Sequence, residues 1–154
     1  MVDFVKSFRQ GLSLADIARK NREEIQEVFA ELNAQLNSAT GGKIRIYLTL
    51  DTTIGNILVF KLTQGVGAYN VVVASNPLIE NSPVKHLARW SPSPEGYPCT
   101  ITVGKTEYVC VNKKSLEETL ATMLQDPSVG KSLQILLNLD AEQVERDNDC
   151  EDTQ

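Results

Sequence analysis

The chain has 154 residues, of which 42% are hydrophobic and 23% charged, and its 15 basic and 20 acidic side chains give a net charge of −5. These proportions are those of a globular domain, and they exclude a disordered chain and a fibrous one. No apolar run approaches the ~20 residues that cross a bilayer, and the N-terminus lacks the basic-then-apolar order of a signal peptide. We therefore expect a cytoplasmic protein with no membrane partner.

Acidic side chains are concentrated at the end of the chain. Residues 140–154 contain seven Asp or Glu and one Arg, which leaves a charge of +1 for residues 1–139. The acidic segment has no repeated apolar stripe, so it cannot bury enough surface to offset the entropy of ordering it. The sequence predicts a single domain over residues 1–139 and a disordered acidic tail, with a solvating role, over residues 140–154.

The first forty residues have the periodicity of a helix. Apolar residues recur every three or four positions from Leu14 to Leu36, and Ser13 is the expected N-cap. A shorter element before this helix is expected to end near Gly11 and to pack back on the long helix. The apolar stripe is widened by Ile17 and Phe29, which favours packing against a sheet.

The same helix also fits a heptad pattern, which would allow it to pair with a second copy of the chain. One polar layer, at Asn21, would fix the register of such a pair. Sheet packing is favoured because the stripe is broader than a two-helix seam, and a homodimer is kept as the alternative. The two sets of heptad positions are Leu14, Asn21 and Val28, and Ala18, Ile25 and Leu32.

From Lys43 the period of the apolar pattern changes from 3.6 to 2, which predicts strands. The second strand is apolar on both faces, as in the centre of a sheet. A stiff exposed loop, rich in Ser and Pro, is expected over residues 91–96. Short connections require mostly antiparallel pairing. The six expected strands are residues 43–50, 54–63, 69–74, 84–90, 100–103 and 106–109.

Gly104-Lys105 is the clearest turn in the chain. Glycine in the first central position fits a two-residue type II′ hairpin, and such a turn sets the pairing of the strands on either side. The residue pairs predicted from this turn are Val103 with Thr106, Ile101 with Tyr108, and Cys99 with Cys110.

Two helices are expected after the hairpin. Ser115 and Glu118 fit a capping box that opens a helix ending near Gln125. Asp126-Pro127 then starts a second helix, because proline is tolerated in the first turn. The predicted fold class is α+β: a mostly antiparallel sheet of about six strands, covered by the long N-terminal helix and two C-terminal helices.

Candidate catalytic residues are few, because His86 is the only histidine. It lies on an alternating strand with Ala88 and Trp90 on the same side, where a hydrogen-bonded structural histidine is expected. Nucleophilic catalysis would have to use this one imidazole, and no nucleophile-elbow motif accompanies it. A small enzyme that uses His86 with a cysteine or a carboxylate is therefore the alternative to a binding protein.

Cys99 and Cys110 are expected to face each other at a hydrogen-bonded pair of the hairpin. The Cβ atoms of such a pair lie farther apart than a disulfide prefers, and the cytoplasm is reducing. Two thiols are therefore favoured over a bridge. We expect no metal and no cofactor, because paired ligand motifs are absent and two glycine-containing segments, 65–67 and 125–132, lack the pattern of a phosphate loop.

The lack of a catalytic motif favours a non-catalytic protein-binding module of the inhibitor, chaperone or accessory-factor type. The body charge of +1 provides no broad basic field, so weak nucleic-acid binding is a lower-ranked alternative. Chemistry, if the protein has any, is expected at His86, Cys99 or Cys110. The candidate partner-binding residues are Asn21, Val28, Leu32 and Trp90.

Overall fold

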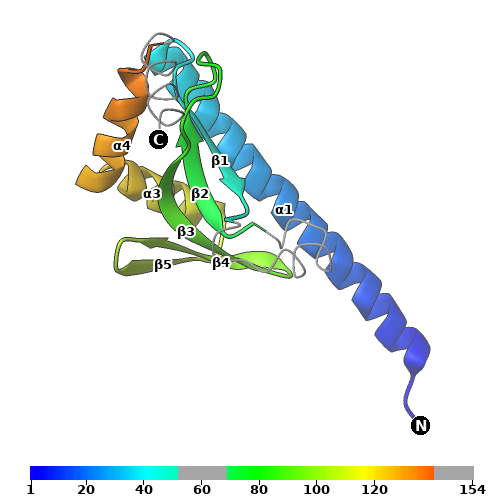
Figure 1. The fold of residues 1–154 in the computed structure, drawn as a ribbon. Coiled ribbons are helices and arrows are strands. Elements are labelled where there is room, and N and C mark those ends of the chain that lie inside the picture. The colour runs from blue at the N-terminus through cyan, green and yellow to red at the C-terminus, as the bar shows by residue number, and fades with distance from the viewer. Residues whose placement is uncertain (52–68, 141–154) are drawn as a thin grey trace, which may run out of the picture.

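The computed structural model describes residues 1–51 and 69–140. Within these residues it contains three helices and five strands (Figure 1). The predicted strand 54–63 and residues 141–154 of the predicted acidic tail lie outside the described residues. The elements are α1 (Phe4–Thr40), β1 (Arg45–Thr49), β2 (Val71–Ser75), β3 (Lys85–Ser93), β4 (Gly96–Val103), β5 (Thr106–Cys110), α3 (Lys113–Leu124) and α4 (Pro127–Leu137).

The described strands form one antiparallel sheet in chain order, so β1 and β5 are its edges. The α+β class and the antiparallel sheet are confirmed, with five strands found where six were predicted. The β4–β5 hairpin has the predicted register, including Cys99 opposite Cys110. Gly104 has a φ of +61°, in the left-handed region that the first central residue of this turn requires.

The loop predicted over residues 91–96 is instead the end of a second hairpin. β3 continues to Ser93, which pairs with Gly96, so that only Pro94 and Glu95 form the turn. The pairing shifts register between Ser91 and Ser93. Pro92 lies at this irregularity, where its missing N–H breaks no regular ladder hydrogen bond. Proline content alone therefore led to the wrong prediction of a loop.

α1 is one continuous helix of 37 residues, so the predicted break near Gly11 and cap at Ser13 are wrong. Its N-cap is Asp3, whose carboxylate accepts a hydrogen bond from the Lys6 N–H at 3.0 Å. A single glycine inside a helix costs only about 1 kcal/mol relative to alanine, which is too little to end it. Residues 1–17 are all exposed, and Figure 1 shows this part of α1 extending beyond the sheet.

The rest of α1 and the two later helices cover the sheet, as predicted. α1 contacts β1, β4 and α3, while α3 also packs against β5 and α4 against β3. The ring of Phe29 meets Trp90 edge-on, with the two ring centroids 6.0 Å apart. One hydrophobic core joins all these elements, and Ile46, Leu116 and Leu136 at its centre are 0% exposed.

α3 begins two residues before the predicted capping serine. Asn112 is its N-cap, and the Asn112 side chain accepts a hydrogen bond from the Ser115 N–H at 2.9 Å. The Ser115 hydroxyl in turn accepts from the Asn112 N–H at 3.1 Å. Ser115 is therefore the last residue of the capping box and not the first. α4 begins at Pro127 after the N-cap Asp126, as predicted.

Candidate functional site

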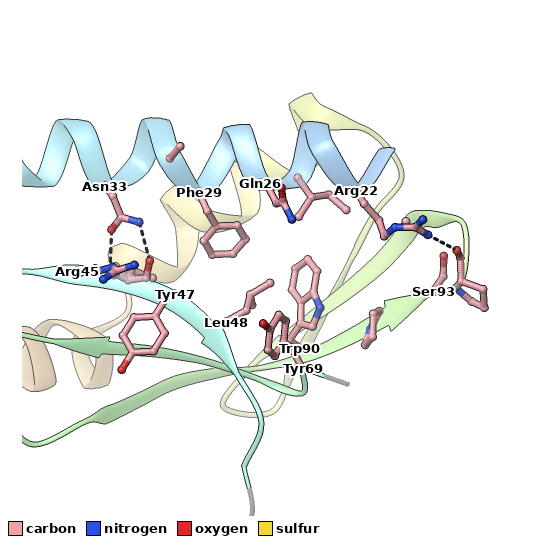
Figure 2. Close-up of a pocket in the computed structure, with 16 residues that line it drawn as sticks. Arg22, Gln26, Phe29, Asn33, Arg45, Tyr47, Leu48, Tyr69, Trp90 and Ser93 are labelled. Atoms are coloured by element: carbon pink, nitrogen blue, oxygen red, sulfur yellow. Dashed lines mark hydrogen bonds between the residues drawn. The ribbon is translucent and has the colours of Figure 1, made fainter. Parts of the chain in front are cut away.

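A cavity of about 660 Å³ lies between α1, β1 and the end of the β3–β4 hairpin. Figure 2 shows an apolar middle, in which Phe29 from α1 lies above Leu48 from β1 and Trp90 from β3. Tyr69, just before β2, lines the same region. Because these residues come from four separate parts of the chain, the cavity is a product of tertiary packing.

One end of the cavity is built around Asn33 of α1. Its amide Nδ2 donates to the Ile46 carbonyl and its Oδ1 accepts from the Ile46 N–H, both at 2.8 Å (Figure 2). β1 lies at the edge of the sheet that the described strands form, and these backbone groups of Ile46 point away from β2. The Asn33 side chain thus occupies the place of a further strand and holds α1 beside β1. The Arg45 guanidinium at this end lies 5.6 Å from the Tyr47 ring centre.

The opposite end of the cavity is held by contacts between α1 and the β3–β4 turn. Asn21 Nδ2 donates to the Glu95 carbonyl at 2.9 Å, and Arg22 Nη1 donates to the Pro94 carbonyl at 3.3 Å. Gly96 has a φ of +87° and approaches α1 so closely that a Cβ there would lie 2.7 Å from the Asn21 Cβ. Asn21, predicted as a partner contact, therefore bonds to a turn of its own chain.

Two buried polar atoms in the residues that line the cavity lack hydrogen-bond partners. They are Trp90 Nε1 and Ser93 Oγ, which find no partner in the part of the chain that the structure describes. Trp90 is 3% exposed, so solvent does not satisfy its N–H. A buried donor without an acceptor costs about 1–3 kcal/mol, which makes both atoms unusual.

The other residues predicted to contact a partner lie in or against the core. Val28 is 4% exposed, and Leu32 is half-buried against the core cluster. Trp90 also belongs to this cluster. The large apolar side chains that α1 exposes come before Ala18. Leu14 and Ile17 were predicted on the apolar stripe of the long helix, and the ones before them on a short element packed back on it; both predictions of burial are wrong. Their exposure could not be recognised from spacing alone.

His86 lies on the opposite face of the sheet from Ala88. The register shift between Val72 and Val73 leaves Leu87 without an opposite residue, and this bulge reverses the alternation along β3. The prediction that His86 shares a side with Ala88 and Trp90 is therefore wrong. The His86 side chain is 55% exposed, and its Nδ1 is 3.9 Å from Asp51 Oδ2, too far for a hydrogen bond.

Cys99 and Cys110 are free thiols in the core and are both 0% exposed. The hydrogen bond between the two thiols, with Cys99 as donor, raises the pKa of Cys99 and lowers the pKa of Cys110, and burial adds to the rise at Cys99. Cys110 also contacts the Thr119 hydroxyl at 3.4 Å. The structure thus brings the two thiols together but leaves His86 on an exposed surface that the enclosed thiols do not share.

Among residues 1–51 and 69–140, no cluster of three His, Cys, Asp or Glu side chains could hold a metal ion. In the same residues, no helix is both long enough and apolar enough to cross a membrane.

Comparisons of the chain with models of protein families, with curated proteins and with solved structures find no match.

Proposed function

We propose that the protein is a non-catalytic protein-binding module that contacts its partner through an apolar stripe on the projecting part of α1. The 3.6-residue repeat places the four stripe residues on one side of the helix. Their exposure is the observation that carries the proposal. The stripe consists of Phe4, Val5, Phe8 and Leu12, which are 76%, 60%, 65% and 54% exposed.

Exposed aromatic and aliphatic side chains gathered on one surface are typical of a protein contact. Burial of a side chain of this size is worth roughly 1.5–3 kcal/mol relative to exposure. The residues opposite the stripe include Lys6, Gln10 and Ser13, so the helix has a polar side for solvent. Leu14 and Ile17 are also exposed, but the same repeat places them on the other side of the helix, so they are not part of the stripe.

The projecting segment receives little packing support from the described part of its own chain. Residues 4–17 are helical and each is exposed, so they have little packing within the described chain. Helices of about 12–15 residues are marginal in water when isolated, and Gly11 weakens this one by about 1 kcal/mol. A partner that buries the stripe would supply the missing packing.

The stripe fits a partner with an apolar groove or another apolar helix. Phe4, Phe8 and Leu12 are spaced by four residues, as in amphipathic helices that lie in a groove of the protein they bind. A second copy of the chain is the alternative partner, because an exposed helix of this kind can pair with itself.

We expect Phe8→Glu to abolish partner binding while leaving the fold intact. The substitution puts a charge in the middle of the stripe, where a desolvated carboxylate is costly. The native chain and the variant would each be used as bait in a lysate, with captured proteins quantified by mass spectrometry. Gln10→Glu, which adds the same charge on the opposite side of the helix, is the matched control.

A captured protein that is retained by Gln10→Glu and reduced at least about tenfold by Phe8→Glu would support the proposal; such a loss corresponds to 1.4 kcal/mol. Equal capture by all three chains would contradict it. Sedimentation velocity over a range of protein concentrations identifies self-association. A dimer that Phe8→Glu dissociates would identify the second copy as the partner.

A further inference from the structure

We propose that the cavity between α1 and β1 binds an extended peptide segment of a partner protein, with an apolar residue in its middle and an acidic residue at each end. The segment would lie along the edge of β1 as a further strand of the sheet. This site is separate from the stripe on the projecting part of α1 and does not depend on the contact proposed there.

The cavity follows the edge of β1. Four consecutive residues of this strand, 45–48, line it. Neighbouring side chains of a strand point to opposite faces of the sheet, so a space that touches all four residues lies beside the strand and not above one face. β1 is the outermost of the described strands on this side. The cavity therefore has the position of a strand added to the sheet.

The backbone of Leu48 offers hydrogen-bonding groups to such a strand. The N–H and C=O groups of Ile46 point away from β2, towards Asn33, and the direction of these groups alternates along a strand. Those of Leu48 therefore also point away from β2, and they form no hydrogen bond within the described residues. Free edge groups of this kind are a template for strand addition. Asn33 already bonds to Ile46, so the added strand would bond to Leu48.

The position of Leu48 requires an apolar residue in the middle of the segment. Two residues that form a hydrogen-bonded pair in a sheet have their side chains on the same face, close enough to contact each other. Leu48 is half-buried against the core that contains Phe29 and Trp90, and all three residues line the cavity. The residue opposite Leu48 would therefore meet apolar surface, which suits a β-branched side chain such as valine.

The charge of the cavity determines the ends of the segment. The chain as a whole carries −5, but the charged side chains among the described lining residues are Arg22 and Arg45. Neither arginine forms an ion pair within residues 1–51 and 69–140. The two lie at opposite ends of the cavity (Figure 2). A segment with an acidic residue at each end would be attracted to both, whereas a basic segment would be repelled.

The separation of the two arginines gives the length of the segment. Arg45 lies at the Asn33 end of the cavity, and Arg22 precedes Asn33 by eleven residues on α1. At 1.5 Å per helical residue, this separation is about 17 Å along the helix. A strand rises about 3.4 Å per residue, so a segment of about five residues covers the same length.

Nuclear magnetic resonance can observe the proposed hydrogen bond at Leu48 directly. Uniformly ¹⁵N-labelled full-length protein would be titrated with the peptide acetyl-Asp-Thr-Val-Thr-Asp-amide. We expect a saturable downfield shift of the Leu48 amide proton. Hydrogen exchange at this amide should be at least about tenfold slower with saturating peptide, because the N–H gains an acceptor.

Two control peptides separate strand addition from general adsorption. The peptide acetyl-Lys-Thr-Val-Thr-Lys-amide has the same middle and the opposite charge, and it should bind at least about tenfold more weakly. The Asp peptide with an N-methylated valine keeps every side chain but loses the central backbone N–H. It should also bind at least about tenfold more weakly, because the main-chain hydrogen bonds supply the affinity in this binding mode.

Variants of the chain test the position of the peptide. Arg22→Gln and Arg45→Gln should each raise the Kd for the Asp peptide by about threefold at low salt, as expected for loss of a partly exposed ion pair. Lys20→Gln removes the same charge from an exposed position of α1 outside the cavity and should leave the Kd unchanged. Phe8→Glu should also leave it unchanged, because the stripe is a different surface. The amide spectrum of each variant reports whether it is folded.

Four results would overturn the proposal. The first is a Leu48 amide that is already protected from exchange without peptide, which would show that the chain itself covers this edge, or a second copy if protection rises with protein concentration. The second is a Leu48 amide that the Asp peptide leaves unchanged. The third is equal affinity for the Asp peptide and either control peptide. The fourth is an unchanged Kd in both Arg22→Gln and Arg45→Gln while their spectra show a native fold.

Discussion

Gly96→Ala is expected to lower the free energy of unfolding by about 2–5 kcal/mol. The φ of +87° at Gly96 disfavours any side chain, and a new Cβ would lie 2.7 Å from the Asn21 Cβ and 3.3 Å from the Arg22 backbone nitrogen. α1 cannot move away without stretching the hydrogen bonds from Asn21 to Glu95 and from Arg22 to Pro94. Backbone strain and steric overlap therefore add.

Gly104→Ala is the matched control for this substitution. Gly104 also has a positive φ, +61°, but a Cβ there would meet nothing within 4 Å among the described residues. Its expected loss is about 1–2 kcal/mol, from backbone strain alone. Urea denaturation gives both free energies. Equal losses would contradict the close contact between Gly96 and α1, and with it the packing that forms this end of the cavity.

Local signals predicted much of the sheet. Gly104 was enough to set the β4–β5 register, because the conformation of a two-residue turn determines which residues face each other. The alternation from Lys43 likewise identified β1. The bulge at Leu87 had no such signal, since it depends on how β2 and β3 pair, and it moved His86 to the other face.

For the helices, too, the sequence predicted what a local signal determines and missed what tertiary packing determines. Asp126-Pro127 marked the start of α4, because proline at the first helical position is a local rule. The apolar spacing in residues 4–12 was recognised as helical, but its exposure was not, since periodicity indicates which side is apolar and not what covers it. The stripe proposed as the partner contact became visible only with the continuous α1.

The cavity could not be predicted from the sequence. Its lining combines residues of α1, β1 and β3 with Tyr69, and no spacing rule connects these segments. Trp90 was selected as a partner contact, yet it belongs to the core and has a buried N–H without an acceptor in the described residues. Such a feature depends on the absence of a neighbouring acceptor, which only a three-dimensional arrangement can show.

Asn33→Leu is expected to lower the free energy of unfolding by about 2–4 kcal/mol. Leucine is close to asparagine in size, so the main change is loss of both hydrogen bonds to Ile46, each 2.8 Å long in the native chain. Ile46 is 0% exposed, so water cannot replace the lost partners unless β1 separates from α1. Each backbone group left unsatisfied costs about 1–3 kcal/mol.

Gln35→Leu, on the same helix, provides the comparison for Asn33→Leu. The Gln35 amide donates to Glu31 at 2.9 Å on an exposed surface, and such a pair is worth only about 0.2–0.5 kcal/mol. Urea denaturation would measure both losses, and hydrogen exchange at the Ile46 amide would locate the effect. We expect faster exchange at Ile46 in Asn33→Leu alone. Equal stability losses with unchanged exchange would contradict the prediction. They would mean that the hydrogen bonds from Asn33 to Ile46 do not fix β1 beside α1 at this end of the cavity.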